Sequence, residues 1–94
     1  MPIELLPRER AELKARAHAL NPVVQIGQGG ASDTAVAEVD RALTAHELIK
    51  VKLAGDREER HALANTLAAR TDAAIVQQVG RVVVLWRPSP DDAA

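Results

Sequence analysis

The sequence predicts a small single-domain α/β fold with the element order αβαβαββ, in which helices pack on a mixed four-stranded sheet. Three observations predict this class. Apolar residues change repeatedly between helical spacing and short strand-like runs. Hydrophobic residues make up 47% of the 94-residue chain, which is enough for one aliphatic core. No linker or repeat divides the chain, so we expect one domain over residues 1–90 and a disordered acidic tail at 91–94.

The first helix is expected over residues 7–19, because Pro7 suits the first helical position and Asn21-Pro22 would end the helix. Residues 23–27 then form a short apolar strand. The apolar positions that recur at roughly helical spacing are Leu6, Leu13, Ala17 and Leu20.

Two further helices carry recognisable start signals. Ser32 is a good N-cap for the second helix, because its hydroxyl can accept a hydrogen bond from the first turn. Asp56 and Glu59 form a capping-box pattern that starts a third helix over residues 57–70. The apolar residues expected on the buried faces of these two helices are Val36, Val39, Leu43, Leu63 and Leu67.

Residues 48–54 alternate strictly between apolar and polar and predict a strand. Its apolar side chains would point to one face of the sheet, and Lys50 and Lys52 to the other. Strand–helix–strand units normally make right-handed crossovers, so the first three strands should be parallel. Because only two helices cross over, we expect one sheet face to lack full helical cover and both lysines to face solvent.

Two β-branched runs, residues 73–79 and 82–87, complete the sheet. Gly80-Arg81 separates them, and glycine at the first central position fits a type II′ turn. We therefore expect these strands to be antiparallel neighbours. Trp86 should share a face with the other alternate apolar residues of its strand, and we expect it to be buried rather than to stack on a base.

The most informative stretch for function is Gly27-Gln28-Gly29-Gly30, a Gly-x-x-Gly turn between a strand and a capped helix. Glycine has no Cβ to obstruct a ligand, and the first amides of a helix have no intrahelical partner. The turn could therefore hold a phosphate through backbone N–H groups. The pattern is more often a plain strand-to-helix turn, and the residues alone leave both interpretations open.

Composition excludes several kinds of site. The chain has no cysteine, and Trp86 is its one aromatic residue, so thiolate chemistry is excluded and base stacking on an aromatic sheet nearly so. His18, His46 and His61 show no metal-ligand spacing, and we expect no metal or cofactor. The net charge of −1 argues against a general polyanion binder unless positive charge is clustered. No apolar run reaches membrane-spanning length and no signal-peptide pattern is present, so we expect a cytoplasmic protein that does not enter membranes.

Several separated motifs occur in one order between residues 5 and 88. They are Leu-Lys-Ala-Arg-Ala-His-Ala-Leu-Asn-Pro-Val-Val (13–24), Ile-Gly-Gln-Gly-Gly (26–30), Ala-Glu-Val-Asp-Arg-Ala-Leu (37–43), His-Glu-Leu-Ile-Lys-Val-Lys (46–52) and Val-Leu-Trp-Arg-Pro (84–88). With these motifs the chain resembles the YhbY-like, CRM-domain family (chloroplast RNA splicing and ribosome maturation). The resemblance implies a fold similar to the C-terminal domain of bacterial translation initiation factor three.

The resemblance also implies RNA binding through the glycine turn and neighbouring basic residues. For stand-alone bacterial members it implies association with ribosomal RNA in precursors of the large ribosomal subunit, with ribosomal proteins as further candidate partners. We expect a monomer. Three departures remove positive charge, namely neutral Gln28 in the turn, Asn21 where lysine is frequent, and Asp91-Asp92 in place of a basic tail. We therefore expect weaker or more shape-dependent binding than in a typical member.

Basic residues outside the turn extend the candidate site, although each has a simpler interpretation as solvated surface. Lys50 and Lys52 would lie about 6.6–7 Å apart on one strand face, close to the spacing of successive phosphates. Asp33 would repel a nearby phosphate, and we assume that it points away. The residues predicted to contact RNA are Gly27, Gln28, Gly29, Gly30, Arg10, Lys14, His18, His46, Lys50, Lys52 and Arg87.

Two other function classes compete with RNA binding. An enzyme is not predicted, because Ala31-Ser32 follows Gly30 where a Walker loop needs Lys-Ser/Thr, and no nucleophile is paired with a base. The near-neutral charge mildly favours the alternative of a protein-interaction module that acts on ribosomal or assembly proteins without direct RNA contact. Salt dependence separates the two, because counterion release weakens RNA binding as salt rises.

Overall fold

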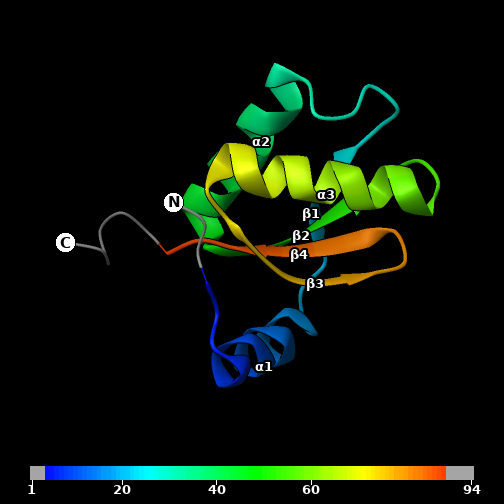
Figure 1. The fold of residues 1–94 in the computed structure, drawn as a ribbon. Helices are drawn as coiled ribbons and strands as arrows, with labels where there is room; N and C mark the ends of the chain where they lie inside the picture. Colours follow the sequence, from blue (N-terminus) through cyan, green and yellow to red (C-terminus); the bar gives the residue numbers. More distant parts are fainter. Residues whose placement is uncertain (1–3, 89–94) are drawn as a thin grey trace.

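The computed structural model describes residues 4–88, in which seven elements follow the predicted order αβαβαββ (Figure 1). They are α1 (Pro7–Ala17), β1 (Pro22–Ile26), α2 (Asp33–His46), β2 (Leu48–Leu53), α3 (Arg57–Thr71), β3 (Ala74–Val79) and β4 (Val82–Trp86). The predicted fold class is confirmed. The tail expected at 91–94 lies outside the described residues. None of the helices within 4–88 is long and apolar enough to cross a membrane.

The strands lie in the order β1-β2-β4-β3. β1 pairs parallel with β2, and β4 pairs antiparallel with both β2 and β3. The first three strands therefore run in the same direction, and β4 lies between the second and third in the opposite direction. This central position explains the unbroken apolar run of β4, because Val83 and Leu85 are buried on one face and Val84 on the other.

Helices cover the two faces of the sheet unequally, as expected (Figure 1). α2 and α3 pack on one face and form the main core, and α1 alone packs on the other. The main core includes Val39, Leu43, Ile49, Val51, Leu53 and Leu67. The smaller cluster under α1 consists of Leu13, Ala17, Leu48, Val76 and Val84, with Trp86 partly buried against it. Part of the α1 face remains open, and it carries half-buried Lys50 and exposed Lys52.

α1 is shorter than the sequence predicts, because it ends at Ala17 rather than at residue 19. Leu6 and Leu20 were expected to continue its apolar stripe, but they are 53% and 37% exposed. Leu6 is the N-cap and Leu20 follows the last turn, so neither keeps the helical phase that brings Leu13 and Ala17 onto the sheet. The apolar contact of α1 is therefore limited to about one turn.

The predicted helix starts and the hairpin are confirmed. The Ser32 hydroxyl accepts a hydrogen bond from the Ala35 amide at 3.2 Å. Asp56 Oδ1 accepts from the Glu59 amide at 2.9 Å, and Glu59 Oε1 accepts from the Asp56 amide at 3.4 Å. Gly80 has a φ of +56° and Arg81 is not among the residues with positive φ, as a type II′ turn requires.

A bulge in β3 was not predicted. Ile75 lies opposite Leu85 and Gln77 lies opposite Val84, so one extra residue is inserted between them. As a result, Val76 is buried under α1 and Gln77 also lines the α1 face. The guanidinium of Arg10 on α1 donates to the carbonyl oxygens of Ile75 and Val76, which fixes the bulge to the helix.

Candidate functional site

The glycine turn has a compact backbone geometry. The Gly30 amide donates to the Gly27 carbonyl at 3.1 Å, and the Ser32 amide donates to the Gly30 carbonyl at 2.9 Å. Gly30 has a φ of +66°, which a residue with a Cβ adopts only under strain. Gly27 and Gly29 do not have positive φ, and a Cβ at either position would meet no atom within 4 Å. The fold therefore requires glycine at Gly30 but not at Gly27 or Gly29.

Three amides of the turn are available to a ligand. Within residues 4–88, the amides of Gln28, Gly29 and Ala31 donate to no protein acceptor. Gln28 and Gly29 are exposed, and Ala31 is half-buried. Successive backbone N–H groups at the start of a helix form a concave donor surface that suits an anion. The turn thus presents the amides that the phosphate-clamp prediction needs.

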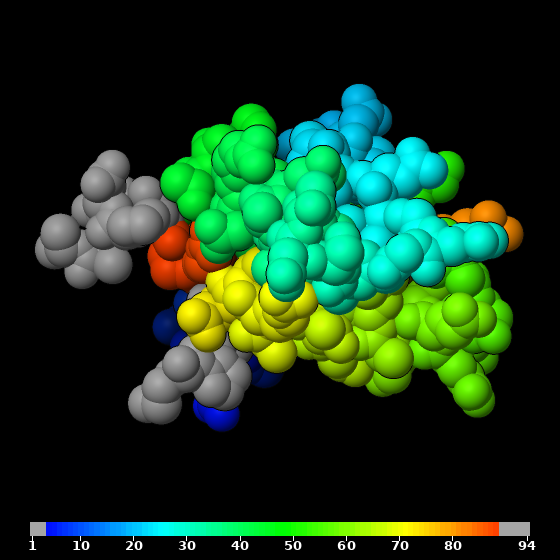
Figure 2. All heavy atoms as spheres, turned by 90° about the horizontal axis from the view of Figure 1, so that it is seen from above, coloured from blue at the N-terminus to red at the C-terminus, as the bar shows by residue number. Residues whose placement is uncertain are grey.

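Three loops meet at the end of the sheet that carries the glycine turn (Figure 2). The Ala54 amide donates to the Ile26 carbonyl at 3.1 Å, which joins the turn to the loop before α3. Arg60 Nε donates to the Gly80 carbonyl at 3.1 Å, and its Nη1 donates to the Gly55 carbonyl at 2.6 Å. Arg60 therefore fixes the β3–β4 turn beside the start of α3.

The charges around the glycine turn are unequal on its two sides. Asp33 Oδ1 pairs with Arg70 Nη2 at 2.8 Å, and Arg70 Nη1 also donates to the Ala31 carbonyl at 2.9 Å. The arginine offsets the carboxylate that would otherwise oppose a phosphate here. On the side toward α3, Glu59 lines a pocket of about 430 Å³ together with Gln28. The carboxylate of Glu59 disfavours an anion on that side.

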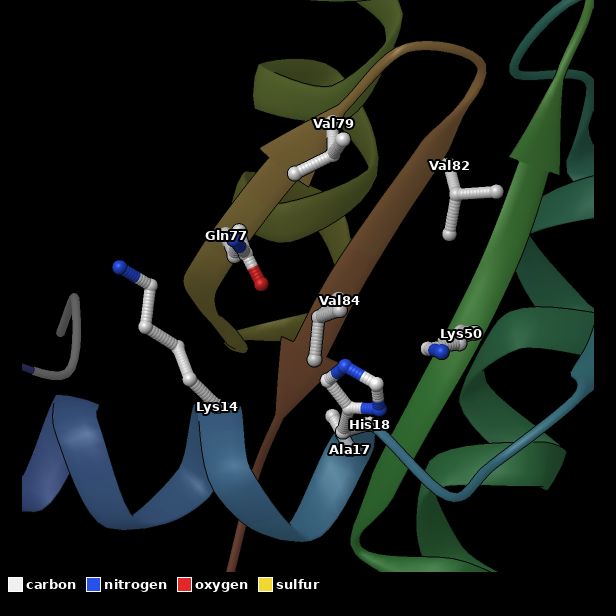
Figure 3. A pocket seen from close by; sticks show the side chains of 8 residues that line it. All are labelled: Lys14, Ala17, His18, Lys50, Gln77, Val79, Val82 and Val84. Carbon is white, nitrogen blue, oxygen red and sulfur yellow. The ribbon is translucent and has the colours of Figure 1, made fainter.

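Lys50 and Lys52 lie on the open part of the α1 face. Lys52 is opposite Gln25 in the β1–β2 register, two residues before the glycine turn begins, so the lysine and the turn lie at the same end of the sheet. Lys50 lines a groove of about 380 Å³ together with Lys14 and His18 of the α1 end (Figure 3). Across residues 4–88, no carboxylate lies within ion-pair distance of these four side chains. The structure therefore brings these four predicted residues onto one face that leads to the turn.

Arg87 has a different position from the one expected of a phosphate contact. Its Nη1 donates to Asp40 Oδ1 at 2.6 Å and to the Thr71 carbonyl at 2.7 Å. Its Nη2 donates to the Asp40 carbonyl and to Thr44 Oγ1, both at 3.0 Å. The side chain is only 17% exposed. The structure thus gives Arg87 an internal role, because it joins β4 to α2 and to the end of α3.

Arg10 and His46 are also separated from the glycine turn. The guanidinium of Arg10 donates to two carbonyl oxygens at the β3 bulge, so it is less available to RNA than Lys14 and His18 are. His46 ends α2 just before β2, at the end of that strand opposite to Lys52. From Leu48 to the turn end of β2 the distance is about 16 Å by strand rise.

Two residues at the site were missed by the sequence interpretation. Arg81 is exposed in the β3–β4 turn, and its carbonyl accepts from the Leu53 amide at 2.7 Å, which places it beside the loop before α3. Its place in the predicted hairpin could have indicated an exposed charge. Gln77 enters the groove only because of the bulge, for which the sequence gives no signal.

Comparisons with known proteins agree on one family. The profile of the CRS1 / YhbY (CRM) domain matches residues 5–87. An RNA-binding protein of Haemophilus influenzae is 46% identical over 88 residues, which cover 93% of this chain and 89% of the relative. A probable RNA-binding protein of Pseudomonas aeruginosa is 37% identical over 87 residues, covering 92% and 84%. The solution structure of a Staphylococcus aureus protein, itself an RNA-binding candidate, superposes with a TM-score of 0.81 at 32% identity and covers 92% and 91% of the two chains.

Proposed function

The chain belongs to the CRS1 / YhbY (CRM) domain family, and we propose that it is a non-catalytic protein that binds ribosomal RNA of large-subunit precursors and assists their assembly. The names of the relatives support RNA as the ligand class. The ribosomal part of the proposal comes from the resemblance to stand-alone bacterial members of the family. The glycine turn and the lysines of the open sheet face would contact the RNA backbone.

The observation that carries the proposal is that two residues of the turn are glycines although the backbone there would accept another residue. Gly27 and Gly29 have neither a positive φ nor a neighbour that a Cβ would meet. Glycine at a position that alanine can occupy costs about 0.4–1 kcal/mol of stability, because the unfolded chain gains freedom. Close approach of a phosphate to the free amides of the turn explains why side chains are absent there.

The charges favour one direction of approach. Glu59 lies on the α3 side of the turn, whereas Lys52 lies at the same end of the sheet on the open face. A phosphate at the turn would therefore be followed by further phosphates along Lys52 and Lys50, about 6.6–7 Å apart. Contacts of this kind are to the backbone, so low sequence specificity is expected from them.

Sedimentation of native lysates tests the proposal. Tagged wild-type protein should travel with large-subunit precursors through a sucrose gradient, and ribosomal RNA should be enriched with it. The variants are Lys50→Glu/Lys52→Glu on the open face and Gly29→Asp in the turn, each checked for folding. The control Arg8→Glu/Arg41→Glu changes two exposed arginines away from the site and alters the net charge as much as the lysine variant does.

Co-sedimentation that is lost in both site variants and kept in the control supports the proposal. Wild-type protein that stays at the top of the gradient at low salt, with no enriched RNA, contradicts it.

The second candidate, a protein-interaction module, is favoured by one observation, the 61% exposure of Val79 on the open face. An apolar interface would weaken little with salt, whereas log affinity for single-stranded RNA should fall with log salt with a slope of about −0.7 per phosphate contact.

A further inference from the structure

We infer that the groove between the end of α1 and the β3–β4 hairpin receives one unpaired RNA base, whose flanking phosphates are bound by Lys14 and Lys50. The inference rests on the proposed function and names the RNA feature that this surface recognises. The groove has a volume of about 380 Å³. Small-molecule sites range from about 300 to 1,000 Å³, so the groove is of a size for a single nucleotide rather than for a helix.

The groove has an aliphatic wall. Val79, Val82 and Val84 line it from the hairpin, and Ala17 lines it from α1 (Figure 3). Val79 is 61% exposed, whereas Val84 on the same face is buried under α1. Bases taken out of a stack are held between aromatic or apolar side chains. Trp86 is the one aromatic residue of this chain, so the valines of the groove are the side chains that can accept the flat face of a base.

Gln77 supplies the polar contact that the edge of a base requires. The bulge in β3 turns this side chain into the groove (Figure 3). Arg10 fixes the bulge through two carbonyl oxygens. Within residues 4–88, the side-chain amide of Gln77 makes no hydrogen bond to another protein group. A glutamine amide has a donor and an acceptor side by side, which matches the edge of adenine. Gln77 can therefore hold the edge of a base whose face lies on the valines.

The charges of the rim select a nucleotide over a neutral apolar ligand. Lys14 lies at one end of the groove and Lys50 at the other, with His18 between them (Figure 3). None of the three lies within ion-pair distance of a carboxylate in the described part of the chain. An occupant that is apolar in the middle and anionic at both ends satisfies the valines and both lysines at once. A base with its two flanking phosphates has this chemistry.

Three hairpin RNAs of one sequence test the inference. The first has a single bulged adenosine, the second has an abasic nucleotide at the bulge, and the third is fully paired. Their affinities are measured by fluorescence anisotropy for wild type, for Gln77→Glu, and for the control Gln78→Glu. Gln78 is the next residue of β3 and lies opposite Val83, whose side chain faces the other side of the sheet. The readout is the affinity ratio of adenosine to abasic bulge, since a general charge effect cancels in it.

Wild type should bind the adenosine bulge about tenfold more tightly than the abasic bulge, because the abasic nucleotide lacks both the face that packs on the valines and the edge that pairs with Gln77. Gln77→Glu should lower this ratio toward one, and Gln78→Glu should keep it. Equal binding of the two bulges by wild type would overturn the inference while leaving RNA binding intact, and would assign the groove to another occupant such as an acidic apolar peptide. Absence of binding to all three RNAs would overturn the proposed function and the inference together.

Discussion

Substituting methionine for Arg87 should destabilise the fold without weakening RNA binding. Methionine keeps most of the aliphatic stem and removes every donor. The charge-assisted hydrogen bond to the carbonyl of buried Thr71 is worth about 1.5–3 kcal/mol. The ion pair with Asp40, whose side chain is 56% exposed, adds about 0–1 kcal/mol. We therefore expect the free energy of unfolding to fall by about 1.5–4 kcal/mol.

Urea denaturation followed by circular dichroism measures this loss as a lower midpoint with an unchanged slope. In a domain of this size the melting temperature should fall by roughly 6–32 °C. Arg81→Met is the matched control, because Arg81 is exposed and its side chain makes no hydrogen bond within residues 4–88; its effect should stay within about 0.5 kcal/mol. Unchanged stability of Arg87→Met combined with weaker RNA binding would refute the internal role and restore Arg87 as an RNA contact.

Three further predictions follow from the backbone and the caps. Gly29→Ala should leave the urea midpoint unchanged or higher, whereas Gly30→Ala should lower stability by about 1–2 kcal/mol because of its positive φ; equal effects would contradict the glycine argument. Glu47 has φ 62° and ψ −46°, so Glu47→Gly should raise stability by about 0.5–2 kcal/mol, and a loss would show that no strain is relieved. The hydrogen bond that the Glu59 amide donates to the Asp56 carboxylate holds the pKa of Asp56 below its ordinary value of 3.8. The stabilisation by Asp56 is therefore present at neutral pH and lost as the pH falls through the lowered pKa, and the destabilisation by Asp56→Ala should fade in acid-titrated melts; a pH-independent effect would contradict it.

Local signals in the sequence predicted the elements of this fold well. Ser32, Asp56 and Gly80 each act through residues that are two or three positions away, so their roles can be recognised without a tertiary structure. The strand order was not predicted, although the five consecutive apolar residues of β4 indicate a strand that is buried on both faces. The alternation in β2 correctly assigned the lysines to the open face because strand periodicity depends only on neighbours.

The candidate site was predicted less completely, because long-range partners decide which basic side chains are free. Arg87 meets acceptors 16 to 47 positions away in the chain, and Arg10 meets carbonyls 65 and 66 positions away. No local pattern distinguishes these arginines from Lys50 and Lys52, which have no carboxylate within ion-pair distance in the described residues. Gln77 depends on an irregularity of β3 that tertiary contacts fix.

The most direct test of RNA binding at this surface is a titration of the ¹⁵N-labelled protein with a hairpin RNA, followed by amide chemical shifts. Binding at the glycine turn and the open face should shift the amides of Gln28, Gly29 and Ala31 together with those of Lys50 and Lys52. The amides near His46, at the other end of β2, should stay in place. Shifts that cluster at His46 and leave the glycine turn unchanged would contradict the proposed interface.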